Sequence, residues 1–351
     1  MDVHKGCLLA VAIFAALPNS ATADSVSDFY EGKQIRFIIR ANPGGNYDLY
    51  MRLLARHIVR YIPGKPTAVP VNMPGGGGLT ALNYTVNVAP HDGTVVTMVT
   101  QTTPMDQALG LDKNLKIDMR SMNWIGNMSD ENLFLVTVRD SPTKTLQDAT
   151  KRETPLAATG AGGVEVIVAS VLNSMLGTKF KSILGYRSSP EMNVSMQRRE
   201  AEGRMTTNLR ALFGATSGGA SAFNILVQTG LKVAPDYPKV PLLRELAKDP
   251  EQKVVLDFIS RSMSLGRPVA TNQKVPAERM AALRRAFDAT MKDPQFLSEA
   301  KQQGLDISPW TGAELHQVVA DIVNTPAAQV DRIRQAIRAG LSSEQRRKVP
   351  K

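Results

Sequence analysis

Three glycine-rich segments carry the residues of this chain best suited to binding a ligand through the main chain. They are Pro43-Gly44-Gly45, Pro74-Gly75-Gly76-Gly77-Gly78 and Thr159-Gly160-Ala161-Gly162-Gly163. Each lies between an apolar, strand-like run and a helical pattern. Glycine lets the backbone approach a ligand closely, and the free amides at a helix N-terminus favour a negatively charged oxygen. The sequence therefore predicts turns that bind one small anion.

Glycine turns are also the ordinary way for a strand to reach a helix, so each segment alone is weak evidence for a site. None of the three has the lysine and hydroxyl of a phosphate-binding P-loop, and none has the G-x-G-x-x-G spacing of a dinucleotide fold. A carboxylate is therefore a simpler ligand than a nucleotide.

Residues for catalysis are not grouped along the sequence. His57, His91 and His316 lie in separate segments, the only cysteine is Cys7, and no G-x-S-x-G pattern or local metal motif is present. We therefore expect no enzyme, no metal site and no cofactor. The alternative is a hydrolase-like periplasmic enzyme whose residues meet only in the folded protein.

Hydrophobic spacing predicts the elements that would position the first two glycine segments. Residues 35–39, 68–72 and 94–100 are strand-like, and helical patterns follow the first two of them at 49–61 and 79–88. This order is a βαβαβ unit with parallel strands. In such units the ligand binds beyond the carboxyl ends of the strands.

A similar order surrounds the third glycine segment, with a strand at 155–159, a helix at 164–176 and a strand at 179–184. A later strand at 265–271 is followed by helical patterns at 276–291, 313–324 and 327–339. The chain is long enough for two cores of ordinary size, about 100–200 residues each. The sequence thus predicts two lobes with a cleft between them.

The N-terminal segment is typical of an export signal. Lys5 gives it a basic start, residues 8–17 are apolar, and Ala21-Thr22-Ala23 places small residues at a cleavage site. We expect cleavage after Ala23 and a periplasmic location.

The formal net charge of the 351 residues is +10, which is compatible with an acidic ligand. Nucleic acid is a less suitable partner, because the basic residues are dispersed and the aromatic content is only 5%. The densest basic run, at residues 346–351, is typical of a solvated tail.

Several short motifs, taken together and in this order, resemble the periplasmic solute-binding receptors of tripartite tricarboxylate transporters, also called the Bug or TctC family. The motifs are residues 30–36, Pro43-Gly44-Gly45 with Asp48, residues 72–77, residues 89–94, Tyr186-Arg187, and Asp293-Pro294 followed by Gly304. They are spread over nearly the whole mature chain.

The resemblance implies an α/β protein similar to the type II periplasmic binding proteins, with two lobes that are each a mainly parallel sheet flanked by helices. We expect a signal peptide at 1–23, lobe one at 24–136, lobe two at 137–258, a return to lobe one with C-terminal helices at 259–342, and a basic tail at 343–351. The implied protein is a monomer that encloses a small carboxylate and delivers it to a membrane permease. A co-receptor for a membrane sensor is a further alternative.

We expect the ligand to contact backbone amides and short polar side chains around the cleft. The expected residues are Gly44, Gly45, Asn46, Asp48, Gly76, Gly77, Gly78, Thr100, Gln101 and Thr102 on lobe one, and Thr159, Gly160, Ala161, Gly162, Gly163, Tyr186 and Arg187 on lobe two. Asp48 has an equal alternative as a helix cap. Tyr186 has one as a packing residue.

Two features depart from the family pattern around the first turn. Arg40-Ala41-Asn42 stands where relatives tend to have an apolar or proline-rich approach, and Tyr47 replaces a small residue. A guanidinium there would strengthen carboxylate binding, or would simply lie on the surface. Residues 204–208 also lack the acidic residue often found in relatives. The choice among citrate-like, aromatic and amino-acid ligands stays open.

Overall fold

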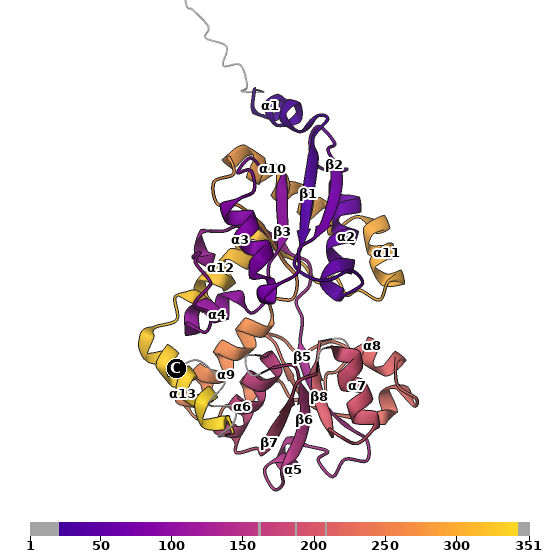
Figure 1. Ribbon diagram of the computed structural model, residues 1–351, viewed down its shortest axis with the longest axis vertical. Helices are drawn as coiled ribbons and strands as arrows, with labels where there is room; N and C mark the ends of the chain where they lie inside the picture. Colours follow the sequence, from indigo (N-terminus) through magenta and orange to yellow (C-terminus); the bar gives the residue numbers. More distant parts are fainter. Residues whose placement is uncertain (1–20, 161–162, 187, 208, 343–351) are drawn as a thin grey trace, which may run out of the picture.

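The chain folds into two α/β lobes, which lie one above the other in Figure 1. This computed structural model describes residues 21–160, 163–186, 188–207 and 209–342. The expected α/β fold with two lobes is confirmed.

Lobe one is built on a sheet of six strands within the described residues, in the order β11-β4-β10-β3-β1-β2. Strands β1, β2 and β3 are parallel, with Gln34 of β1 opposite Thr67 of β2, whereas β10 is antiparallel to both β3 and β4. The strands are β1 (Gln34–Ile39), β2 (Thr67–Asn72), β3 (Val95–Met98), β4 (Asn123–Asn127), β10 (Pro268–Thr271) and β11 (Trp310–Thr311). Strands β1 to β4 therefore share one direction.

Helices cover both faces of this sheet, since β1 contacts α2 and α3, and β4 contacts α10 and α12. The helices of lobe one are α1 (Ala21–Tyr30), α2 (Asn46–Ile58), α3 (Leu79–Asn87), α4 (Thr103–Leu109), α10 (Ala277–Thr290), α11 (Pro294–Gln302) and α12 (Gly312–Val323), with short 3₁₀ turns at Gly76–Gly78 and Met119–Ser121. Two-sided cover explains why β1 and β3 are almost continuously apolar and buried.

Lobe two repeats this plan around the sheet order β7-β6-β8-β5-β9. Strands β6, β7 and β8 are parallel, and β5 is antiparallel to β8 and β9. The strands are β5 (Leu133–Val138), β6 (Thr154–Ala158), β7 (Phe180–Leu184), β8 (Gly203–Thr206) and β9 (Phe223–Thr229). The helices are α5 (Leu146–Ala149), α6 (Val164–Leu176), α7 (Ser189–Gln197), α8 (Leu209–Gly214), α9 (Pro250–Met263) and α13 (Ala327–Gly340), with 3₁₀ turns at Gly219–Ala222 and Leu243–Leu246.

The chain passes between the lobes at three places. Residues 128–132 lead from β4 to β5, and residues 264–267 return from α9 to β10. These two segments lie side by side, because Asp130 and Leu265 form an antiparallel bridge. The third passage leads from α12, which packs on β4, to α13, which packs on α6. The first passage lies before residue 136, the expected end of the first part of lobe one, and α13, one of the C-terminal helices expected within 259–342, packs on α6 of lobe two.

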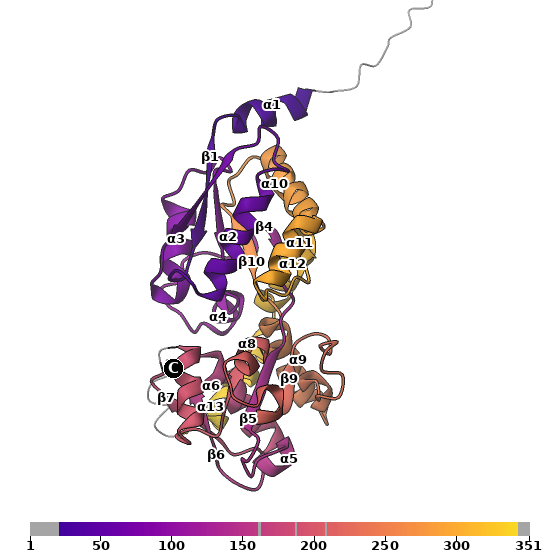
Figure 2. The ribbon, with the colours of Figure 1, turned by 90° about the vertical axis from the view of Figure 1, so that its right-hand side faces the viewer.

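One apolar cluster extends through both lobes. It includes Trp124 of β4, Ile322 of α12, Ile333 of α13 and Ile259 of α9, all with 0% of their surface exposed. Burying each such side chain stabilises the fold by about 1.5–3 kcal/mol. This cluster joins the lobes on the side where α4, α9, α12 and α13 gather in Figure 1. Figure 2 shows the same two lobes after a quarter turn, again one above the other.

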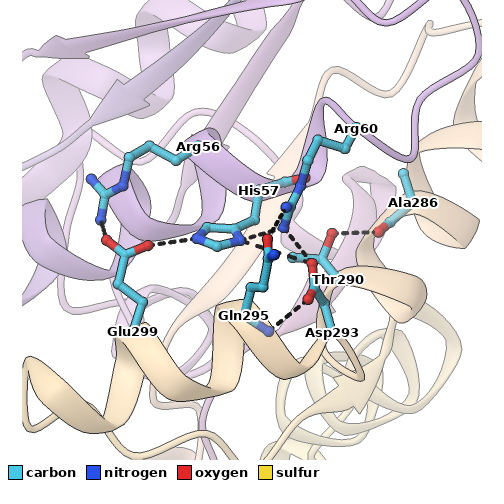
Figure 3. A network of polar contacts seen from close by, with 8 residues as sticks. All are labelled: Arg56, His57, Arg60, Ala286, Thr290, Asp293, Gln295 and Glu299. Carbon is cyan, nitrogen blue, oxygen red and sulfur yellow. Dashed lines mark hydrogen bonds and ion pairs between the residues drawn. The ribbon is translucent and has the colours of Figure 1, made fainter.

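A polar network holds α2, the helix after the first glycine turn, against α11 (Figure 3). His57 Nε2 lies 2.6 Å from Glu299 Oε2, and His57 Nδ1 lies 2.5 Å from an Arg60 nitrogen. Because a guanidinium only donates, Nδ1 accepts and Nε2 carries the proton that it donates to Glu299. Arg56 also pairs with Glu299, and Arg60 pairs with Asp293. Contacts with α11 therefore fix the position of α2 and of the first glycine turn that precedes it.

This network predicts a pH-dependent contribution to stability. The hydrogen bond from His57, with help from Arg56, lowers the pKa of Glu299. Such a carboxylate stabilises the fold above its unfolded-state pKa, about 4.3, and the contribution is lost as the pH falls through the lower folded-state pKa. Glu299→Gln should therefore unfold at lower urea than wild type near pH 7, and the difference should shrink below about pH 4. Glu278→Gln, at an exposed position, is the control. An equal loss of stability in the control, or a loss in Glu299→Gln that does not depend on pH, would contradict this account.

Candidate functional site

The loops that follow the parallel strands of each lobe are directed toward the other lobe (Figure 1). On lobe one they follow β1, β2 and β3, and on lobe two they follow β6, β7 and β8. All three glycine-rich segments lie in these loops, which the strand order explains, since each segment ends a strand of the parallel set.

The first glycine turn is held by Asp48. Gly44 has φ +83° and donates its N–H to Asp48 Oδ2 at 2.9 Å, while Asp48 Oδ1 accepts from Arg52 Nε at 2.7 Å and from Asn72 Nδ2 at 2.8 Å. Burial alone would raise the pKa of Asp48, but these hydrogen bonds lower it overall. Oδ2 of Asp48 thus holds the first turn, and Oδ1 connects α2 with the end of β2. The N-cap Gly45 supplies no side-chain cap, so the N-terminus of α2 is left to main-chain amides.

The second glycine turn packs directly against the end of β3. Gly75, Gly76, Gly77 and Gly78 all have positive φ, between +54° and +130°. A side chain on Gly78 would place its Cβ 2.2 Å from Thr100 Oγ1 and 2.7 Å from Arg40 Nε, so only glycine fits. Thr100 Oγ1 donates to Gly77 O at 2.7 Å.

The first turn and the end of β3 are joined by Tyr47. Its hydroxyl accepts a hydrogen bond from Gln101 N at 3.3 Å. Beyond Gln101, Thr102 Oγ1 lies 3.3 Å from Asp106 Oδ2, and burial raises the pKa of Asp106 to about 6. The structure therefore brings the three expected segments of lobe one together, with Arg40 and Tyr47 among them.

The expected segments of lobe two also meet. Gly185 N donates to Thr159 O at 3.2 Å, which links the loops after β6 and β7, and Gly163 N donates to Gly160 O at 2.8 Å. Gly163 is the N-cap of α6 and supplies no side-chain cap. Tyr186 packs against the apolar cluster under α7 and α8, in line with its packing alternative. Ala161, Gly162 and Arg187 lie outside the described residues.

A cavity of about 480 Å³ is lined by residues of both lobes and of the first passage between them. Among the expected residues, Asn46 lines it. The other lining residues were not predicted from the sequence; they are Tyr50, Ser129, Asp130, Glu131, Asn132, Phe134, Thr207, Leu209, Arg210, Lys232, Val233, Ala234, Pro235, Asp236, Tyr237, Asp306 and Ser308. Many of them follow β9, whose apolar sequence at Phe223–Thr229 was a usable signal for a strand and a loop at its end.

The cavity offers both acidic and basic groups. Burial raises the pKa of Asp130 to about 6, and the nearby Lys232 acts in the opposite direction. Arg210 and Asp306 line the same space. This arrangement can accept a polar ligand with hydrogen-bond donors and acceptors. Within the described part of the chain, no group of three His, Cys, Asp or Glu side chains is placed to hold a metal ion.

At the wall of the cavity, a buried ion pair of Glu131 and Arg267 joins the two adjacent passages between the lobes. Arg267 donates to both carboxylate oxygens of Glu131, at 2.9 and 3.0 Å. Its guanidinium carbon lies 4.8 Å from the ring centres of both Tyr47 and Tyr50. Burial alone would lower the pKa of Arg267, but Glu131 and the tyrosines raise it overall. The pair therefore connects α2 with both adjacent passages between the lobes.

Comparison with known proteins identifies the family. Residues 52–335 match the family described as "Tripartite tricarboxylate transporter family receptor". The chain belongs to this family. A curated relative of the receptor, "UPF0065 protein in gbd 5'region" of Cupriavidus necator, is 30% identical over 136 residues, an alignment that covers 38% of each chain.

Solved structures share the fold of this receptor. A TctC solute-binding protein from Polaromonas, solved without ligand, has a TM-score of 0.67 at 19% identity and covers 87% of this chain and 99% of its own. The periplasmic binding protein BugD has a TM-score of 0.63 at 19% identity, with 88% and 98% covered. MatC from Rhodopseudomonas palustris, with bound malate, has a TM-score of 0.62 at 16% identity, with 86% and 99% covered. A further R. palustris protein with adipate has the same TM-score and identity, with 87% and 97% covered.

The family assignment confirms the resemblance seen in the sequence motifs, and these structures support the two-lobed fold. The helices in the described ranges are too short or too polar to cross a membrane.

Proposed function

We propose that this protein is a periplasmic receptor that captures a small carboxylate between its two lobes and delivers it to the permease of a tripartite tricarboxylate transporter. The observation that carries the proposal is the cavity lined by both lobes, in a chain of this receptor family. Its volume, about 480 Å³, is suited to a small organic acid. Two solved structures of the same fold contain a bound carboxylate, adipate in one and malate in the other.

The proposed contacts are the main-chain turns of both lobes, among whose residues Asn46 also lines this cavity. The N-termini of α2 and α6 have no side-chain cap, so their free amides are available to an anion. Gly44, Gly45 and Asn46 would contact the acid from lobe one, together with Gly76 to Gly78 and Thr100 to Thr102. Residues 159–163 and 186–187 would contact it from lobe two. A ligand held by both lobes favours the closed arrangement by its higher affinity for it, and the permease would recognise that arrangement.

Ligand binding should stabilise the folded protein. At a free concentration about a hundred times the Kd, an acid that binds only the folded state adds about 2.7 kcal/mol to the free energy of unfolding. We expect at least one member of a panel of dicarboxylates, tricarboxylates, aromatic acids and acidic amino acids to raise the melting temperature accordingly. The matched neutral amides are the control. No shift with any acid would count against the receptor function.

Two further measurements separate the alternatives. Recovery of the bound acid unchanged after long incubation is the result expected of a receptor, whereas turnover would indicate an enzyme. Deletion of the protein should abolish uptake of the acid. Loss of gene induction by the acid with intact uptake would instead indicate a co-receptor for a sensor.

A further inference from the structure

Three arginines in the described residues have a buried Nε without a hydrogen-bond partner: Arg40, Arg204 and Arg267. An unsatisfied buried donor is costly, so each such group needs an explanation. Arg267 is paired with Glu131, and Arg204 donates to Ser189 O within lobe two. Among the described residues, no carboxylate lies within ion-pair distance of Arg40. Arg40 therefore carries a charge that the described protein does not neutralise.

Arg40 lies where the expected binding loops of lobe one converge. It directly follows β1, and its Nε approaches Gly78 so closely that a Cβ there would lie 2.7 Å away. Its guanidinium carbon is 4.4 Å from the ring centre of Tyr47, whose hydroxyl is bonded to Gln101 N. The side chain is only partly exposed. The guanidinium is thus held on an aromatic surface beside the first turn, the second turn and the end of β3.

We propose that Arg40 is the counter-charge for a carboxylate group of the ligand and determines the preference of this receptor for acids over their neutral analogues. This assignment rests on the proposed function. A guanidinium presents two parallel N–H groups to a carboxylate, and a stacked arginine loses little side-chain freedom when it binds. The uncapped N-terminus of α2 adds a favourable field in the same region.

A structural role for Arg40 makes a different prediction. If the side chain only supported Tyr47 and the second glycine turn, its removal would destabilise the ligand-free protein. If Arg40 binds an anion of the ligand, its charge is unpaired in the ligand-free protein and lowers the free energy of unfolding. An apolar replacement of similar length should then leave the ligand-free melting temperature unchanged or raise it. Ligand-free stability and ligand affinity therefore separate the two roles.

The test compares Arg40→Met, Arg40→Lys and a matched control, Arg36→Met, in the full-length exported chain. Arg36 lies four residues earlier, within β1 and toward the end of that strand away from the loops, and its guanidinium carbon is 5.5 Å from the ring centre of Tyr84. Isothermal titration with adipate, malate and citrate gives the affinities, with adipamide as the neutral analogue of adipate. Melting without ligand gives the stability.

We expect Arg40→Met to bind the acids at least about tenfold more weakly, as loss of a charge-assisted hydrogen bond implies. Arg40→Lys should recover part of the affinity, Arg36→Met should stay within about twofold of wild type, and only wild type and Arg36→Met should strongly prefer adipate over adipamide. Wild-type affinity in Arg40→Met, or an equal loss in Arg36→Met, would overturn the proposal. A lower ligand-free melting temperature with unchanged selectivity would assign Arg40 a structural role. If the wild-type protein binds none of the three acids, the proposed receptor function for such acids is contradicted, and the assignment of Arg40 falls with it.

Discussion

Glu131→Gln is expected to lower the free energy of unfolding by about 3–5 kcal/mol, the usual cost of removing one partner from a buried ion pair. Glu131 and Arg267 are both nearly inaccessible, with side-chain exposures of 10% and 4%. The substitution keeps the shape of the side chain but leaves the Arg267 guanidinium without a counter-charge between Tyr47 and Tyr50. Urea denaturation of the ligand-free protein measures the effect.

Two comparisons make this expectation specific. Glu131→Gln combined with Arg267→Met removes both charges and should recover much of the lost stability. Glu202→Gln, which breaks the more exposed pair of Glu202 with Arg152 at 2.6 Å, should cost only about 0–1 kcal/mol. A cost below about 1 kcal/mol for Glu131→Gln, or no recovery in the double variant, would show that the buried charge matters little.

Gly78→Val is expected to disturb both folding and ligand binding. Gly78 has φ +107°, which a β-branched residue rarely adopts, and its Cβ would clash with Thr100 Oγ1 and Arg40 Nε. Backbone strain costs about 1–3 kcal/mol, and overpacking costs a similar amount. Because the clash would displace Arg40 and the end of β3, we expect the affinity for acids to fall by more than in Arg40→Met.

Gly77→Ala provides the matched control for this substitution. Gly77 belongs to the same turn and has φ +64°, but a Cβ there meets nothing within 4 Å. Gly77→Ala should lower the free energy of unfolding only by the cost of the left-handed conformation, about 1–2 kcal/mol. The variant should keep the wild-type affinity for the acid. If titration shows equal affinity losses in both variants, the close packing of Gly78 is not what positions the site.

Much of the fold follows from local sequence patterns. The apolar runs that end in glycine turns predict β1, β2 and β6 with their helices, because hydrophobic spacing and turn residues agree there. In contrast, no element was predicted within residues 102–123, yet Thr103–Leu109 forms α4. Its helix is short, starts next to Pro104 and is held by packing against α12, so the local signal was weak.

The site was harder to predict than the fold, because its residues are distant in sequence. The first glycine turn and Asn46 follow from a local motif, but the pairing of Glu131 with Arg267 joins positions 136 residues apart. Nothing in either segment indicates the other. The same holds for Arg40, whose missing partner is visible only when the surrounding loops are in place. Local sequence patterns predict the loops but not the charged groups that meet between them.

The passage from α12 to α13 restricts how this receptor can move. The adjacent passages at residues 128–132 and 264–267 form one attachment between the lobes, and residues 324–326 form a second. Two attachment points define a line, and rotation about that line is the motion that stretches neither connection. Sliding and twisting are therefore opposed. We therefore expect one main rotation between the lobes, which would open and close the cavity lined by Asn46, Thr207 and Arg210.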